Sequence, residues 1–189
     1  MEKNRLNEVL ELHKLWLSGD DGGVKADLSG ADLISADLRW ADLRWAHLDR
    51  TDLRWADLSG ANLSGASLSE ADLIGANLIG AELIEAILRK AELYKANLGK
   101  ANLSRAILHR AYLGRANLHG ANLSRANLIE ASLHKANLSG ADLGGANLSG
   151  ADLRKANLSG ADLGGANLSG ADLRKAELRG ANLRGAEGI

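Results

Sequence analysis

The sequence ANLSGADLGGANLSGADLRK occupies Ala136–Lys155 and is repeated without change at Ala156–Lys175. Each copy divides into four pentapeptides that begin with Ala, have Asp or Asn in second place and have Leu in third. The same unit runs from Ala26 to Gly185 as 32 consecutive pentapeptides with no insertion. Leu takes the third position in every one, and Ala takes the first in all but the repeat that starts with Thr51. Internal repetition of this kind indicates a repeat architecture.

A period of five residues fits neither standard element of secondary structure. On an α-helix, successive leucines would lie about 140° apart and would scatter around the cylinder. On a straight strand, an odd period would send alternate leucines to opposite faces. A chain that turns by about a quarter circle in each pentapeptide places every Leu inside, and the 20-residue block is then one full coil. The period therefore predicts a solenoid of about eight coils, spaced by about 4.8 Å.

The tandem motif A(D/N)LXX, seen in ANLSG, ADLRK and ADLGG, resembles the pentapeptide-repeat family, and in this form it is similar to the cyanobacterial members. The resemblance spans Ala26 to Gly185. It implies an all-β solenoid, a right-handed quadrilateral β-helix in which the central Leu and the preceding Ala point inward. The handedness and the square section follow from the resemblance alone. Identical coils also fit a consensus-designed or recently duplicated repeat protein.

Glycine occupies the fifth position in 14 of the 32 repeats. A corner in every pentapeptide favours a residue that tolerates a positive φ, so we interpret these glycines as turn residues. The alternative is a phosphate-binding loop, but the chain has no G-x-x-x-x-G-K-[ST] motif and its glycines follow the repeat.

The pattern divides the chain into a capping helix with its linker at 1–25, the β-helix at 26–185 and a short tail at 186–189. Within the first segment, apolar residues at i, i+3 and i+4 predict an amphipathic helix over Asn4–Leu17 that covers the first coil. The tail is too short to form a helical cap, so a homodimer through the C-terminal coil is predicted, as the resemblance also implies. The apolar positions expected in the capping helix are Leu6, Val9, Leu10, Trp16 and Leu17.

Composition narrows the possible functions. The formal net charge is -1 and there is no Cys, which excludes disulfides, thiolate metal sites and cysteine nucleophiles. The N-terminal segment lacks the apolar core of a signal peptide, and no run of about 20 apolar residues would span a membrane. Acidic residues in the first helix also disfavour a helix lying on anionic lipid. A soluble cytoplasmic protein is therefore expected.

Catalytic, cofactor and metal sites are not expected. The five His are dispersed, and His109 and His119 would fall on opposite faces of one coil. The aspartate column Asp32, Asp52 and Asp72 would offer oxygens from one side only, whereas a cation needs ligands around it. No enzymatic activity is predicted.

One face of the solenoid is expected to carry a ladder of cations, one per coil. We expect Glu92, Asp152 and Asp172 on the same face to offset much of this charge. Nucleic-acid binding is unlikely on this pattern, since Tyr94 and Tyr112 are the only aromatic residues near the ladder. The five members of this basic ladder are Lys95, Arg115, Lys135, Lys155 and Lys175.

The early coils break the rule that polar residues face outward. Three repeats read DLRW and place Trp40, Trp45 and Trp55 on three different faces. Exposed aromatic and apolar residues often mark contact surfaces, so a partner-binding patch is predicted here. The alternative is that some of these tryptophans pack locally under the N-terminal helix or its linker. The remaining members of the predicted patch are Ile74, Ile79, Ile84 and Ile87.

These observations favour a non-enzymatic structural or protein-interaction scaffold, a rigid rod that displays residues on four faces to a protein partner. The alternative from the same family is a DNA mimic that acts on a DNA topoisomerase. This chain departs from that pattern, because its repeats carry similar numbers of acidic and basic residues and lack Phe. A designed or duplicated protein without biochemical activity is the other alternative.

Overall fold

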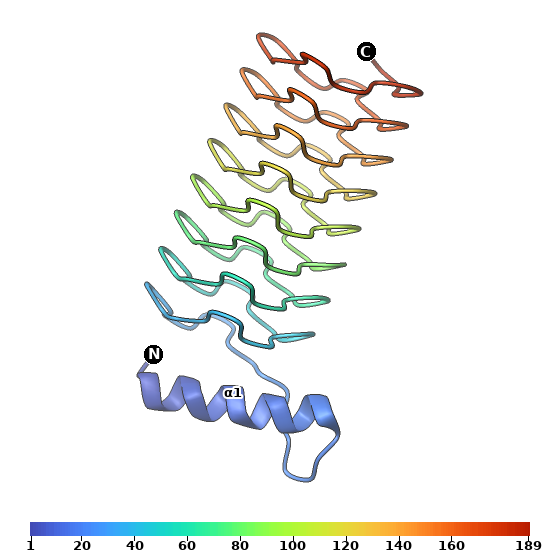
Figure 1. The fold of residues 1–189 in the computed structure, drawn as a ribbon. Helices are drawn as coiled ribbons and strands as arrows, with labels where there is room; N and C mark the ends of the chain where they lie inside the picture. Colours follow the sequence, from blue (N-terminus) through green and yellow to red (C-terminus); the bar gives the residue numbers. More distant parts are fainter.

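The computed structural model describes residues 1–189 except for the side chain of Lys3. One helix, α1 (Lys3–Ser18), lies across the end of a stack of eight coils built from residues 26–185 (Figure 1). Figure 1 shows the coils as regular layers of similar outline, from cyan near α1 to red at the C-terminus. Within the described part of the chain, no helix is long and apolar enough to cross a membrane.

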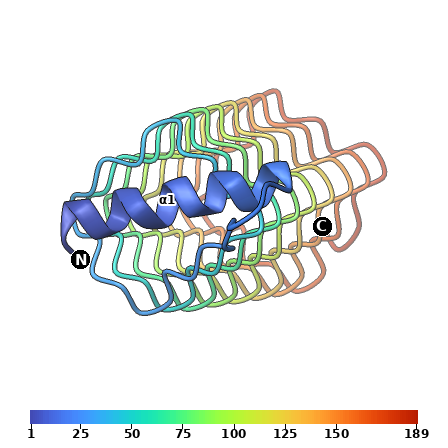
Figure 2. The same cartoon turned by 90° about the horizontal axis from the view of Figure 1, so that it is seen from below.

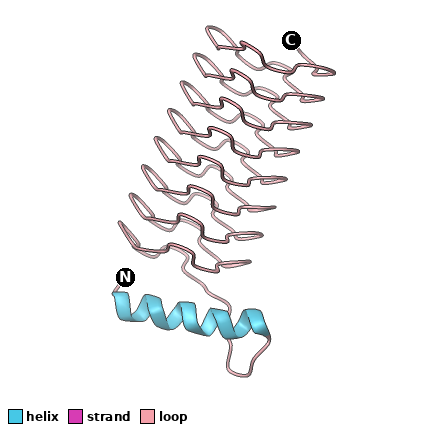
Figure 3. Ribbon diagram, viewed as in Figure 1, coloured by secondary structure: helices cyan, strands magenta, loops and turns pink.

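Successive coils pair in parallel, with each residue opposite the one 20 positions later. The bridges run from Asp27 paired with His47 to Asn167 paired with Glu187, without a change of register. Each pentapeptide contributes one bridging residue and a two-residue turn, so no segment extends far enough to be drawn as a strand in Figure 3. The fold is the predicted right-handed β-helix of eight coils, and its coil is 20 residues long.

Hydrogen bonds between coils involve three of the five N–H groups in each repeat. In the first repeat, the N–H of Leu28 donates to the carbonyl of His47 at 2.7 Å, and the N–H of Gly30 donates to that of Asp49 at 2.9 Å. In the other direction, the N–H of His47 donates to the carbonyl of Ala26 at 2.9 Å. This pattern recurs along the stack, so each coil is bonded to its neighbour on all four sides.

The two remaining N–H groups are satisfied within the repeat. The N–H of Ala31 donates to the carbonyl of Leu28 at 3.0 Å and closes a β-turn. The N–H of Ser29 donates to the side-chain oxygen Oδ1 of Asp27 at 3.0 Å. Asp and Asn are suited to the second position because a short side-chain acceptor two residues back can satisfy a turn N–H that no carbonyl reaches.

The fifth residue of every repeat has a positive φ. The glycines at this position have φ values between 64° and 72°, and the other residues there lie between 55° and 63°. A positive φ at the third residue of a four-residue turn is the type II geometry, which favours glycine. The prediction that the glycines are turn residues is confirmed. The 18 non-glycine residues at this position adopt a conformation that L-residues disfavour by about 1 kcal/mol or more.

The interior is a continuous column of Leu and Ala. The repeat leucines from Leu28 to Leu168 are buried, most of them completely. Thr51, the exception at the first position, is also buried, and its hydroxyl donates to the carbonyl of Leu28 at 2.8 Å. A buried hydroxyl is tolerated here because it has an acceptor.

Helix α1 covers the open end of the first coil (Figure 2). Leu6 is buried, Val9 and Leu10 pack against the core, and Leu17 is half-buried. Trp16 is partly exposed, and its ring stacks on the imidazole of His13 with centroids 5.5 Å apart. The helix extends one residue beyond the expected range at each end.

The linker folds back against the end of α1. A Cβ atom at Gly23 would lie 2.3 Å from the backbone nitrogen of Trp16, so only glycine fits this approach. The N–H of Val24 then donates to the carbonyl of Leu12 at 2.9 Å. These contacts fix the direction in which the chain enters the first repeat.

His13 is the polar centre of the cap. Its side chain is completely buried, and Nδ1 accepts a hydrogen bond from the N–H of Ala26 at 3.1 Å. Burial lowers the pKa of His13; the backbone of Arg44 and the carboxylate of Asp42 oppose this shift, and the cations Lys25 and Arg44 add to it. The neutral imidazole therefore belongs to the folded state.

We predict that the cap loosens as the pH falls below about 6.5, the ordinary pKa of His. The unfolded chain binds a proton there that folded His13 resists, so stability is full above this pH and decreases below it. Protonation at Nδ1 also removes the acceptor for the Ala26 amide. Hydrogen exchange, corrected for intrinsic rates, should show the Ala26 amide losing protection between pH 7.5 and 5.5.

The amide of Asn157, which donates within the distant coils, is the internal control and should keep its protection. The variant His13→Leu should show no pH step at Ala26. Equal protection of the Ala26 amide at both pH values in the wild-type chain would contradict the prediction.

The last coil differs from the first. Leu173, Leu178 and Leu183 are only partly buried, whereas Leu28 and Leu38 under α1 are 2% exposed. In the described residues, the N–H groups of these three leucines have no acceptor. The homodimer through this coil stays a prediction.

Candidate functional site

The three outward tryptophans lie at corners of the first two coils. Trp40 and Trp45 occupy successive corners of the first coil, and Trp55 lies on the second. Their exposed fractions are 79%, 51% and 61%, high for the largest apolar side chain. The three side chains therefore surround the N-terminal end of the rod on three sides.

Each indole lies over a glycine of the next coil, 20 residues further on. A Cβ at Gly60 would be 2.2 Å from Cζ3 of Trp40, and one at Gly65 would be 2.2 Å from Cε3 of Trp45. Trp55 has the same relation to Gly75, at 2.3 Å. The rings thus lean onto the coil farther from the N-terminus. The suggestion that they pack under the N-terminal helix is wrong, because bare glycine backbone on the other side offers a flat seat.

The arginine before each tryptophan is held by the aspartate two residues earlier. In the first DLRW repeat, Nε of Arg39 donates to Oδ1 of Asp37 at 2.8 Å and Nη2 donates to Oδ2 at 2.7 Å. Arg44 and Arg54 make the same forked pairs with Asp42 and Asp52. The hydrogen bonds from these arginines lower the pKa of Asp42 and of Asp52. A DLRW repeat is therefore a rigid unit that presents a fixed guanidinium beside a fixed indole.

The isoleucine part of the predicted patch is less exposed than the sequence suggested. Ile79 is 45% exposed, while Ile74, Ile84 and Ile87 are half-buried against neighbouring coils. Ile79 is therefore the member of this group with the most surface available to a partner.

The basic ladder runs as predicted along one face, but the expected neutralisation is wrong. Among the described residues, none of the five cations has a carboxylate oxygen within 4.0 Å. Asp152 and Asp172 instead bind Arg154 and Arg174 at 2.7 and 2.6 Å. The hydrogen bond from Arg174 lowers the pKa of Asp172 to about 2. Because the Asp and Arg belong to the same turn, they pair with each other and leave the lysines unpaired.

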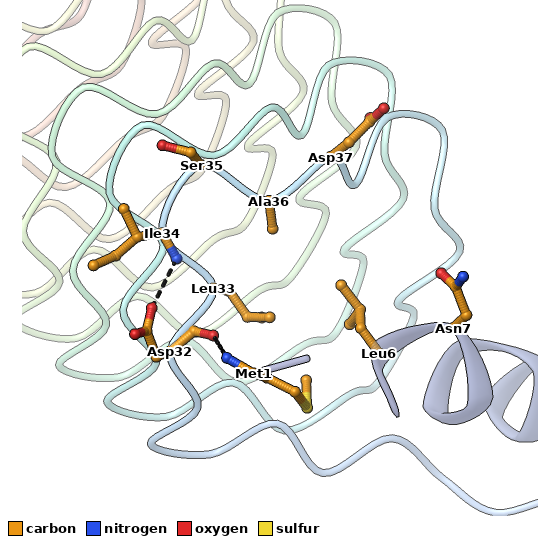
Figure 4. Close-up of a pocket in the computed structure, with 9 residues that line it drawn as sticks. All are labelled: Met1, Leu6, Asn7, Asp32, Leu33, Ile34, Ser35, Ala36 and Asp37. Carbon is orange, nitrogen blue, oxygen red and sulfur yellow. Dashed lines mark hydrogen bonds between the residues drawn. The ribbon is translucent and has the colours of Figure 1, made fainter. Parts of the chain in front are cut away.

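A cavity of about 560 Å³ lies in the seam between α1 and the first coil (Figure 4). Figure 4 shows Leu6 of the helix and Leu33 of the coil directed toward each other, with Met1 beside them. The terminal ammonium of Met1 donates to the carbonyl of Asp32. The seam is a mainly apolar cleft that brings no nucleophile and base together.

Metal and catalytic chemistry find no support in the geometry. The described residues contain no group of three His, Asp or Glu side chains able to hold a metal ion. In the aspartate column, Asp52 is bound to Arg54, and Asp72 lies 3.6 Å from the same guanidinium. The outward surface offers contacts for binding.

Comparison with known proteins agrees with this description. The family model described as pentapeptide repeats matches in eight copies, over residues 24–50, 36–73, 66–105, 106–145 and 146–185. The chain belongs to the pentapeptide-repeat family. No match was found among curated protein sequences.

Solved structures of other pentapeptide-repeat proteins are similar to this chain. HetL of the cyanobacterium Nostoc sp. strain PCC 7120, involved in the regulation of heterocyst differentiation, is 36% identical with a TM-score of 0.58. The alignment covers 95% of this chain and 97% of HetL. A pentapeptide-repeat protein of the Arabidopsis thaliana thylakoid lumen is 35% identical over 48% of this chain and 59% of its own, with a TM-score of 0.26. QnrB1, a plasmid-mediated fluoroquinolone resistance protein, is 22% identical over 84% and 85%, with a TM-score of 0.45.

The pairing of Trp with Gly in this pentapeptide-repeat chain was present in the sequence but was not recognised. Each of the three tryptophans is followed by Gly at a distance of 20 residues, the length of one coil. Once the coil length is known, the two columns can be aligned and the seat of each ring read directly. His13 was assigned to the helix, but its acceptor role at Ala26 required coordinates, because the path of the linker sets that contact.

We predict that Gly60→Ala destabilises the protein more than Gly160→Ala. Both glycines have φ near +67°, so each change introduces a strained residue at a cost of about 1 kcal/mol. At Gly160 the new Cβ meets nothing within 4 Å, but at Gly60 it strikes the ring of Trp40. Displacing that ring should add about 1–3 kcal/mol. Denaturant unfolding of both variants measures the difference.

The double change Trp40→Ala with Gly60→Ala is the control. With the ring removed, alanine at 60 should cost no more than alanine at 160, and the interaction between positions 40 and 60 follows from the cycle. Equal stability of the two single variants would show that the indole does not rest on Gly60.

Proposed function

We propose that this pentapeptide-repeat protein is a non-enzymatic scaffold that binds a protein partner through Trp40, Trp45 and Trp55. The observation that carries the proposal is that each indole is seated on a glycine of the next coil and yet keeps at least half of its surface exposed. A ring fixed before binding loses little conformational freedom when a partner covers it. Tryptophan and arginine are also the residues most often responsible for interface affinity.

The DLRW units support the same function. Each pairs an indole with a guanidinium whose charge is partly satisfied by its own aspartate, as in Arg44 with Asp42. Such a unit offers an apolar surface and remaining N–H donors in one fixed geometry. Ile79, two coils beyond Trp40 on the same face, extends the apolar surface. A partner that contacts all three tryptophans must reach around three sides of the rod.

The alternative of a DNA mimic has no specific observation in its favour. The likeness to QnrB1 reflects the shared fold, and mimicry of DNA would require a predominantly acidic surface. This chain instead displays five unpaired cations in a row on one face. Binding of a protein partner at the early coils therefore remains the function that the geometry supports best.

Homodimerisation through the C-terminal coil is compatible with this scaffold role, because the tryptophans lie at the opposite end of the rod. Sedimentation equilibrium at tens of micromolar protein distinguishes the two states. A monomer of 19.9 kDa at all concentrations would contradict the dimer and would leave the proposed binding of a partner untouched.

We predict that the triple variant Trp40→Ser, Trp45→Ser, Trp55→Ser loses its protein partner while keeping the fold. Loss of three interface tryptophans, at about 2 kcal/mol or more each, should reduce affinity beyond detection in a capture experiment. Affinity capture from the source cells, followed by mass spectrometry and titration of the recovered protein, gives the measurement.

The matched control is Tyr94→Ser with Tyr112→Ser, which removes exposed aromatic rings from the middle of the rod. It should retain the partner that the tryptophan variant loses. The proposal fails if the triple variant keeps its far-ultraviolet spectrum and still binds every partner of the wild-type chain.

A further inference from the structure

The face that carries the basic ladder has a second unexplained feature, a groove of about 510 Å³ near the start of the ladder. The floor of the groove is Gly114, which has no side chain to fill the space. Tyr94 lies on the preceding coil and His134 on the following one, while Tyr112 and Arg115 stand on either side in the same repeat. The groove is therefore a gap in a regular grid of side chains, bordered by two aromatic rings and a cation.

The two tyrosines differ in availability. The Cδ2 atom of Tyr94 lies 3.3 Å from the position of a Cβ on Gly114, and Nζ of Lys95 lies 5.5 Å from the centre of the ring. Tyr94 is therefore held in place on both counts. Tyr112 is 50% exposed and has no ring partner among the described residues. It offers a planar surface on which a second ring can stack.

Polar groups at the edge of the groove lack partners. The carboxyl group of Glu92 is half-buried and makes no hydrogen bond or ion pair in the described residues. Burial raises its pKa, and the charge of Asp72 adds to the shift. Nδ1 of His134 is buried and likewise has no partner among the described atoms. These groups can bond to the edge of a polar heterocycle that enters the groove.

From the groove, the ladder continues as a straight line of exposed cations on successive coils. Arg115 and Lys135 border the groove itself, and Lys155 and Lys175 extend the line to the last coil. The nearest carboxylates on this face, Asp152 and Asp172, are occupied by Arg154 and Arg174. Like charges in a column repel one another, and an anionic chain laid along them relieves that repulsion.

We propose that this face binds single-stranded nucleic acid, with one base on Tyr112 above Gly114 and the following phosphates along Lys135, Lys155 and Lys175. The sequence argued against nucleic acid because neighbouring carboxylates were expected to neutralise the ladder and because aromatic residues were few. The structure removes the first objection, since those carboxylates pair with arginines. It also places both tyrosines at one end of the ladder, where a base can be anchored.

The straightness of the ladder favours a single strand over a duplex. A duplex backbone curves away from a straight line of cations, and its phosphates rise by about 3.4 Å along each strand. The coils are spaced by about 4.8 Å, so a strand that follows them is unstacked and its bases seek aromatic partners. An extended acidic peptide fits less well. Its side chains alternate in direction, so it presents one carboxylate per about 6.7 Å on a given side and no ring for Tyr112.

Fluorescence anisotropy of a labelled 12-nucleotide oligo(dT) with the full chain tests the proposal. We expect binding at low salt, with log K falling linearly against log salt at a slope of about -3.5 for five phosphate contacts. The variant Tyr112→Ser, which copies Ser132 of the next coil, should weaken binding by about tenfold. The double variant Lys155→Ser, Lys175→Ser should reduce the slope by about 1.4.

The matched control for charge is Lys100→Ser with Arg125→Ser. Both residues occupy fifth positions with φ of 57° and 56°, both lack ion pairs in the described residues, and both lie on other faces. This control should leave affinity and slope unchanged. An abasic 12-mer should bind more weakly than oligo(dT) and should be insensitive to Tyr112→Ser.

Four outcomes would overturn the proposal. The first is absence of binding at 20 mM salt, and the second is equal loss of affinity in the control and the ladder variants. The third is a 12-base-pair duplex that binds as tightly as the single strand with the same dependence on Lys155 and Lys175. The fourth is poly-glutamate of matched charge that competes as well as oligo(dT), which would assign the face to an acidic protein segment.

Discussion

Each coil donates backbone N–H groups to the next coil, 20 residues further along the chain, and accepts hydrogen bonds from it in return. This arrangement works only if the register is uniform, because one displaced residue would leave several buried N–H groups without acceptors. The repeat satisfies the condition with few kinds of residue. Leu fills the interior, Ala lets the corners approach, and Asp or Asn accepts from the turn N–H that the ladder does not reach. The surface positions that remain are free to vary.

That freedom explains where functional differences arise. The conformation of the fourth and fifth positions is imposed by the ladder, so a side chain there is displayed at a fixed corner whatever its chemistry. Trp40 is held at a positive φ of 62° and rests on Gly60, and Lys155 is held at 59° with open solvent beside it. The scaffold therefore presents an indole or an ammonium group with equal precision. Properties such as partner binding depend on which columns are filled.

The sequence predicted most of the fold because a single short period dominates it. The coil length, the inward leucines and the turn role of Gly160 and its equivalents follow from the spacing, and the handedness followed from the family resemblance. The cap was predicted from its apolar stripe, but the buried contact between His13 and Ala26 was not, since it depends on how the linker returns. The charge balance of the ladder face was misjudged because faces were compared by column. Pairing is instead decided inside the turn, where Asp152 and Arg154 are closest.

The duplicated block at Ala136–Lys155 and Ala156–Lys175 also bears on how such a rod can change length. Adding or removing 20 residues inserts or deletes one layer and keeps every column in phase, so that Lys135, Lys155 and Lys175 remain aligned. Adding or removing five residues would rotate everything beyond that point by a quarter turn and carry a column onto the adjacent face. Rod length can therefore vary in whole layers without rearranging its surfaces. A single pentapeptide is the smallest insertion that keeps the core intact while reassigning which faces meet a partner.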